Sequence, residues 1–340
     1  VGSEMCIRDR NKYGTDDPRT VDAERRLIFP LYTNGELGES NAIAERLISY
    51  TNAMAPSGKK GNFLMEIAEY KTRLGEYRDS ANFAEQALAQ WQQAGVAGLA
   101  ASVSARMSVA LAMRQYGDYA GAIESYEEMI TLQRRAYGDD AYIVGVSESN
   151  LALLLHEVGR HEEAEKLFRS ALSAWEKVIG KNHRDVLIVR SNLAALLNHV
   201  DRYDEAEEIL LDVNAIASQV LGPDNEELAF YIEELAMVHQ NQEKAAEAEA
   251  GIRKALAIRE KTIGIDHPVT ARNIANLGRH LMVTGELDAA EGYLRQSLEI
   301  RQRIMEPSDI DIAESKASLG LLLLRLGRLD EAETNLATAL

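Results

Sequence analysis

One apolar position recurs along most of the chain at a constant interval of 42 residues. Its members are Ile67, Val109, Leu151, Leu193, Leu235, Leu277 and Leu319. In the same register, a small residue recurs at Ser80, Ala122, Ala164, Ala206, Ala248, Ala290 and Ala332. A fixed period of this length is typical of stacked supersecondary units, each of which buries its apolar faces against its neighbours. The chain is therefore predicted to fold as a repeat array rather than around one globular core.

The copy that begins at Leu151 shows what each unit is. The i, i+3, i+4, i+7 spacing of one helical face is followed by Leu151, Leu154, Leu155 and Val158. After Gly159, the same spacing returns at Ala164, Leu167, Phe168, Ala171, Leu172 and Trp175. Each unit is therefore predicted to be a hairpin of a first helix, helix A, and a second, helix B. With 6% aromatic residues and 6 prolines, the composition also favours helices over strands, so an all-α fold is expected.

Turn and link residues support these boundaries. A glycine stands between the two helices at Gly75, Gly117, Gly159, Gly285 and Gly327. Asp201 and Glu243 replace it in two copies, and the turn at Glu243 is expected to be irregular because Glu tolerates the left-handed conformation poorly. In the link from Gly264 to Pro268, we expect Asp266 to cap the next helix and Pro268 to lie in its first turn.

The chain is expected to divide into three parts. Residues 1–10 are similar to a translated sequencing-adapter artefact and are set aside. Residues 11–60 are predicted to form a degenerate helical repeat, with two helices around Asn34 and Gly35. Residues 61–340 are predicted to form seven repeats, the last of them truncated. Because the chain lacks an initial Met and stops at Leu340 within a predicted helix, both natural ends are expected to be missing.

The residues from Leu151-Ala152 through Gly159, Ala164-Glu165 and Ala171-Leu172 resemble the tetratricopeptide repeat. The 42-residue period and the Gly264–Pro268 link are similar to its kinesin-light-chain subtype, and the resemblance covers about residues 60 to 340. It implies a right-handed superhelical solenoid of antiparallel helix hairpins. It says less about function, since such repeats occur in adaptors, peptide receptors, regulators and enzyme appendages.

The resemblance also implies a binding groove lined by the A helices, with the residue before each anchor leucine touching an extended ligand. These positions carry Asn150, Asn192 and Asn276, with Glu234 between them and Ser108 and Ser318 further out. An amide both donates and accepts, so an asparagine ladder suits the backbone of an extended peptide. Arg272 and Arg279 flank Asn276 and suit a ligand carboxylate. The alternatives are asparagines that cap local turns or meet water, and arginines in internal ion pairs.

Composition argues against several other functions. A net charge of −17 disfavours a nucleic-acid partner, which usually needs a basic surface. Cys6 is the single cysteine, and no apolar run approaches the length of a membrane span. His156 and His161 are five residues apart across the Gly159 turn, so they do not share a helical face as zinc-protease histidines do. No metal, cofactor or catalytic activity is expected.

The expected function is a protein–protein interaction scaffold that binds an extended peptide or a partner helix in the concave groove of the A helices. The alternative is a recruiting or sensory region of a larger enzyme or signalling protein whose catalytic domain is missing from this chain. Self-association is also expected, through an uncapped C-terminal end formed by Leu319, Leu322, Leu323 and Leu326. A cytoplasmic location is expected.

Overall fold

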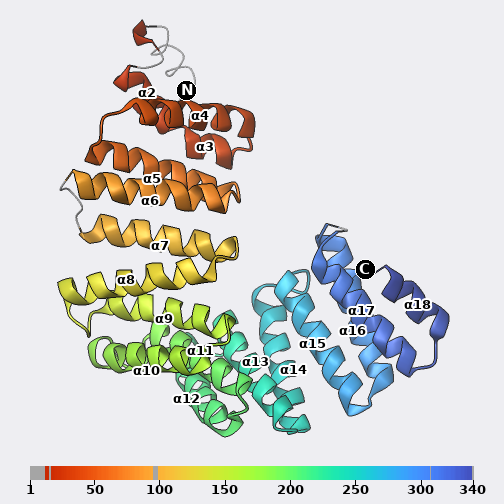
Figure 1. The fold of residues 1–340 in the computed structure, drawn as a ribbon. Helices are drawn as coiled ribbons and strands as arrows, with labels where there is room; N and C mark the ends of the chain where they lie inside the picture. Colours follow the sequence, from red (N-terminus) through yellow and green to blue (C-terminus); the bar gives the residue numbers. More distant parts are fainter. Residues whose placement is uncertain (1–11, 15–16, 95–98, 307, 339–340) are drawn as a thin grey trace. The chain divides into compact units, whose positions relative to one another are not determined.

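The computed structural model describes residues 12–14, 17–94, 99–306 and 308–338. Within these ranges all regular structure is helical, and no strand occurs (Figure 1). The predicted all-α class is therefore confirmed. The segment 1–10, expected to be an artefact, lies outside the described residues. The chain divides into two compact units, Val1–Val178 and Ile179–Leu340.

In the first unit, three helices precede three antiparallel hairpins. The helices are α2 (Pro18–Arg25), α3 (Ile28–Thr33), α4 (Leu37–Ala53), α5 (Gly58–Arg73), α6 (Tyr77–Gln93), α7 (Leu99–Gln115), α8 (Tyr119–Tyr137), α9 (Tyr142–Glu157) and α10 (His161–Val178). The first of the two helices predicted around Asn34 and Gly35 is divided into α2 and α3. Pro30 accounts for the break, because a proline ring clashes with the carbonyl four residues earlier, here that of Arg26.

The second unit consists of four further hairpins. Its helices are α11 (Arg184–His199), α12 (Tyr203–Leu221), α13 (Glu226–Asn241), α14 (Ala245–Thr262), α15 (Pro268–Thr284), α16 (Leu287–Ile304), α17 (Ile310–Arg325) and α18 (Leu329–Ala337). The odd-numbered helices from α5 to α17 are the A helices, and the even-numbered helices from α6 to α18 are the B helices.

The 42-residue register correctly predicts the core. All the small residues of the second series are fully buried, which lets the two helices of each hairpin approach closely. The anchor positions are buried as well, except that Leu235 is half-buried. In the second unit, Leu277 and Leu319 belong to one apolar cluster with residues of the neighbouring B helices. Within each unit, neighbouring hairpins are therefore stabilised by burial against one another.

The turn at Glu243 is regular, so the predicted irregularity is wrong. Its φ of 61° matches the 62° of Asp201 and lies in the same left-handed region as the turn glycines. The closing hydrogen bond from Lys244 N to His239 O is 2.9 Å long, as against 2.8 Å for the bond from Arg160 N to Leu155 O. Side chains next to Glu243 hold the turn, since Lys244 Nζ donates to the Glu207 carboxylate on α12 at 2.7 Å.

The links show one further departure from expectation. Pro268 does begin α15, but the N-cap is His267, whose Nδ1 accepts from Val269 N at 3.2 Å. Asp266 instead pairs with Arg303. His183 caps α11 in the same way, by accepting from Asp185 N. These two histidines thus have a structural role that satisfies a free helix N–H group.

Candidate functional site

The five residues predicted to contact a ligand all lie on A helices. Asn150 lies on α9, in the first unit. The other four lie in the second unit, with Asn192 on α11 and Arg272, Asn276 and Arg279 on α15. All three asparagines are half-buried, Arg279 is half-buried and Arg272 is exposed. The structure brings Asn276 and Arg279 into direct contact.

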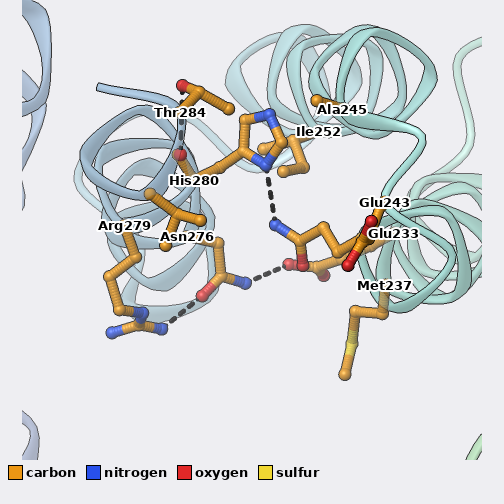
Figure 2. Close-up of a pocket in the computed structure, with 11 residues that line it drawn as sticks. Glu233, Met237, Glu243, Ala245, Ile252, Asn276, Arg279, His280 and Thr284 are labelled. Atoms are coloured by element: carbon orange, nitrogen blue, oxygen red, sulfur yellow. Dashed lines mark hydrogen bonds between the residues drawn. The ribbon is translucent and has the colours of Figure 1, made fainter. Parts of the chain in front are cut away.

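Asn276 is engaged within the protein on both sides of its amide. Its Nδ2 donates to Glu233 Oε1 at 2.6 Å, and its Oδ1 accepts from Arg279 Nη2 (Figure 2). The Asn150 and Asn192 amides have no hydrogen-bond partner among the described residues. The three asparagines are therefore not equivalent, since Asn276 also orients Arg279.

The Glu233 carboxylate is the centre of a buried polar network. Besides Asn276, it accepts from Asn273 Nδ2 at 3.0 Å and from Arg259 Nη1 at 2.7 Å. Arg259 is fully buried on α14. A buried charge is tolerated only when it is paired and hydrogen-bonded, which the two asparagines and the guanidinium provide. The network links α13, α14 and α15 directly beneath the predicted ligand-contacting side chains.

Sequence reasoning missed Glu233 and Arg259, although the register contained a signal. Arg259 stands where Trp91 and Trp175 stand in earlier repeats. A charged residue at a position that elsewhere packs an indole in the core requires a buried partner. Its partner, Glu233, lies directly before the Glu234 that interrupts the asparagine series.

Glu234 has a shifted acid–base equilibrium. Burial raises the pKa of its carboxyl from 4.5 to about 7, and the adjacent Glu233 carboxylate acts in the same direction. The Arg272 guanidinium opposes the shift by favouring the charged form. This face of α13 and α15 therefore changes charge near neutral pH.

A pocket of about 690 Å³ opens beside the network, between α13, α14 and α15 (Figure 2). Its apolar wall includes Met237, Ile252 and Val283, of which Met237 and Val283 are 45% and 76% exposed. His280 is buried in its wall, where its Nδ1 lies 3.0 Å from Gln240 Nε2. The volume is in the range of ligand-binding pockets.

The two histidines of the Gly159 turn are on different helices, as predicted, but the turn brings them together. His156 Nδ1 lies 3.0 Å from His161 Nδ1. Within the part of the chain that the structure describes, no group of three or more potential metal-ligating side chains occurs. Nor is any described helix both long and apolar enough to cross a membrane.

The Leu residues near the C-terminal end are placed differently from expectation. Leu319, Leu322 and Leu323 are buried, and Leu326 packs against the same cluster, because α16 and α18 cover this face of α17. The exposed leucines of α17 are Leu321 and Leu324.

A family profile for the tetratricopeptide repeat matches residues 101–177, 143–213, 227–281 and 271–340, which together make up more than half of the chain. The chain belongs to the tetratricopeptide repeat family. No curated protein matches this tetratricopeptide repeat chain.

Solved structures of other tetratricopeptide repeat proteins share the fold. BtubC (BKLC) from P. vanneervenii is 26% identical, with a TM-score of 0.56 over 64% of this chain and 87% of that one. Kinesin-light-chain-type repeats of Podosopora anserina are 23% identical, with a TM-score of 0.51 over 57% of this chain and 92% of that one. A Rap protein complexed with competence and sporulation factor is 11% identical, with a TM-score of 0.58 over 94% of this chain and 98% of that one. The repeats are thus kinesin-light-chain-like, as expected, and the fold is that of a protein-interaction scaffold.

Proposed function

We propose that this tetratricopeptide repeat protein binds an extended peptide or a partner helix along its A helices, with Asn150, Asn192, Asn276, Arg272 and Arg279 contacting the ligand. The partner is a protein or peptide and not a nucleic acid. A hydrogen-bonding ladder supplies affinity for the ligand backbone, and the arginines favour an acidic group. No catalytic step is part of this function.

The observation that carries the proposal is that exposed apolar side chains lie next to ordered polar groups on α13 and α15, where Arg279 also pairs with Glu314 of α17 at 3.2 Å. Met237 and Val283 are exposed large apolar side chains beside Asn276 and Arg279 at the pocket. The Arg272 side chain has no hydrogen bond or ion pair within the described ranges. Side chains that are ordered by a buried network, next to exposed apolar surface, are what a pre-organised interface requires.

The network beneath the groove also supports this function. The Glu233 carboxylate accepts a hydrogen bond from the Asn276 amide, and the amide oxygen of Asn276 accepts one from the Arg279 guanidinium. Because both side chains are already ordered, a ligand would lose less binding free energy to side-chain ordering than it would on a mobile surface. The Rap protein, which shares the fold, is solved in complex with competence and sporulation factor.

The test uses the full chain and a peptide-display library to select binding peptides. The affinity of a selected peptide is then measured for the wild type and for the variant Asn150→Ala, Asn192→Ala, Asn276→Ala. Loss of up to three hydrogen bonds is expected to weaken binding by about tenfold or more. The control variant changes exposed amides of two B helices, Gln92→Ala and Gln219→Ala, and should bind as the wild type does.

Two results would contradict the proposed site. Equal affinities of the wild type and the asparagine variant would show that the asparagines do not contribute to peptide binding. Equal weakening by the Gln92 and Gln219 control would show that the B helices contact the ligand instead. Thermal unfolding of each variant confirms that the array is intact before affinities are compared.

A further inference from the structure

The pocket between α13, α14 and α15 lies where one repeat has a small side chain and the other repeats have larger ones. The position of Ala245 in the 42-residue register is occupied by Tyr77, Tyr119, His161, Tyr203, Ala245, Leu287 and Leu329. Ala245 is the one small member of this series, and it lines the pocket. In the next repeat, Leu287 packs against the apolar cluster of its hairpin. Where Ala245 stands, the corresponding volume is open.

The preceding repeat shows which group fits such a place. Tyr203 is half-buried at the equivalent position, and its hydroxyl is hydrogen-bonded to the Asp201 carboxylate two residues before it. In the repeat with the pocket, Glu243 stands at the position of Asp201, and it too has the left-handed backbone conformation. This repeat therefore keeps a carboxylate at the turn but lacks the phenol that bonds to it.

The pocket retains the other features that a phenol needs. Glu243 lines it, is exposed, and has no ion pair or side-chain hydrogen bond in the described part of the chain. Met237 and Ile252 supply apolar surface for an aromatic ring, and Val283 stands exposed beside them. Figure 2 labels Met237, Ile252 and Glu243 among the residues that line the pocket. An amphipathic aromatic side chain buries its ring and keeps its hydroxyl bonded, which matches this combination.

We propose that this pocket receives a tyrosine side chain of a partner peptide, with the ring against Met237 and Ile252 and the hydroxyl donating to Glu243. The inference rests on the proposed peptide-binding function and names one residue type that the peptide carries. The partner's tyrosine takes the place that Tyr203 occupies within its own repeat. At this one position of the register, the ligand supplies the large side chain that the other repeats supply themselves.

The first experiment uses p-cresol, the side-chain analogue of tyrosine, and records the ¹³C-methyl resonance of Met237 in the full chain. A saturable shift of this resonance is expected. Toluene, which lacks the hydroxyl, is expected to bind about tenfold more weakly because the hydrogen bond to a charged acceptor is absent. The capped peptide acetyl-Ala-Tyr-Ala-amide is expected to bind more tightly than p-cresol, and the reverse order would indicate a site for free phenols and overturn the assignment.

Three variants test the geometry. Ala245→Tyr fills the pocket with the chain's own consensus residue and should abolish the p-cresol shift while leaving the melting temperature equal or higher. Ala246→Tyr, at the next and exposed position of α14, is the matched control and should leave binding unchanged. Glu243→Ala, which removes the acceptor, should reduce p-cresol binding to the level of toluene. Unchanged p-cresol binding by Ala245→Tyr would overturn the proposal.

The same variants separate this inference from the proposed function. A selected peptide that loses affinity for the triple asparagine variant but not for Ala245→Tyr would leave the groove function intact and refute the tyrosine pocket. A peptide that loses affinity for Ala245→Tyr alone would support the pocket and refute the asparagine ladder. A concentration-dependent dimer that Ala245→Tyr dissociates would show that a second copy of this chain fills the pocket, which would also overturn the proposal.

Discussion

The indole of Trp175 lies directly against Gly145, so that a Cβ at Gly145 would overlap the ring nitrogen. That nitrogen donates to Tyr142 O at 3.0 Å, and the Tyr142 ring stacks on the indole at a centroid distance of 5.0 Å. A similar contact between indole and glycine joins Trp91 to Gly61 in an earlier hairpin. A glycine one turn from the start of helix A is therefore what allows helix B to place a large aromatic ring in the core.

Replacing Gly145 by alanine is expected to destabilise the first unit by about 1–3 kcal/mol, because the added methyl group overpacks a buried contact. The measurement is the free energy of unfolding in urea. Gly292→Ala is the matched control, since Gly292 lies in α16 with no atom near its Cβ position. That change should stabilise by about 0.5–1 kcal/mol through helix propensity. Equal effects of the two changes would show that the Trp175 contact is not tight.

Removing the buried Glu233 carboxylate is expected to cost about 3–5 kcal/mol, because Glu233→Ala leaves the Arg259 guanidinium buried without its partner. The double variant Glu233→Gln, Arg259→Met removes both charges and should recover much of this loss. Arg160→Ala, which breaks an exposed ion pair with Glu163, should cost less than about 1 kcal/mol. A double variant as unstable as Glu233→Ala would indicate that packing, rather than the unpaired charge, dominates.

The raised pKa of Glu234 predicts a stability that falls as pH rises. Between the ordinary value of 4.5 and about 7, the folded protein holds a proton that the unfolded chain releases. Its contribution is therefore most favourable below this window and is lost as pH rises through it. Glu234→Gln should raise the free energy of unfolding by about 1–3 kcal/mol at about pH 8, and by much less at about pH 5.

Urea denaturation at the two pH values checks this prediction. The exposed Glu260, changed to Gln, is the control and should have the same small effect at both. If Glu234→Gln also has a pH-independent effect, Glu234 does not hold a proton in the folded protein at neutral pH.

Self-association through α17 is expected to depend on Leu321 and Leu324, which are 53% and 44% exposed. Exposed apolar surface of this kind favours association between copies. Sedimentation velocity over a range of concentrations should show association of the wild type and its loss in Leu321→Gln, Leu324→Gln. Leu211→Gln on α12, where the side chain is 52% exposed, is the control. A wild type that remains monomeric at high concentration would refute the prediction.

The fold was predictable because the features that specify it are periodic and local. The positions of Leu277 and Ala290 in the 42-residue register are enough to place both helices of a hairpin and the faces that they bury. The left-handed turn residues could also be placed, because that conformation is a property of single positions. At Glu243 the prediction failed because bonds between neighbouring side chains and α12 offset the poor preference of Glu for this conformation.

The candidate site was less predictable because its partners come from different repeats. Asn276 could be placed on helix A from the sequence, but its bond to Glu233 joins residues 43 positions apart on two helices. Spacing within one helix says nothing about such a bond. The pocket is lined in part by Ala245, and the small size of this residue stands out only when the equivalent positions of all repeats are compared.

The core position shared by Trp175 and Arg259 also fixes which helices can pair. The indole needs a glycine on the opposing helix, whereas the guanidinium needs the Glu233 carboxylate. If α14 packed against α9 in place of α10, the Arg259 guanidinium would lie where the Trp175 indole now packs. If α10 packed against α13 in place of α14, the Glu233 carboxylate would be buried without its guanidinium partner. Chains made of similar repeats are prone to misfold, either by pairing a helix with the equivalent helix of another repeat or by exchanging hairpins between molecules. In this chain, unlike pairs in the core give individual hairpins their own identity and disfavour such misassembly.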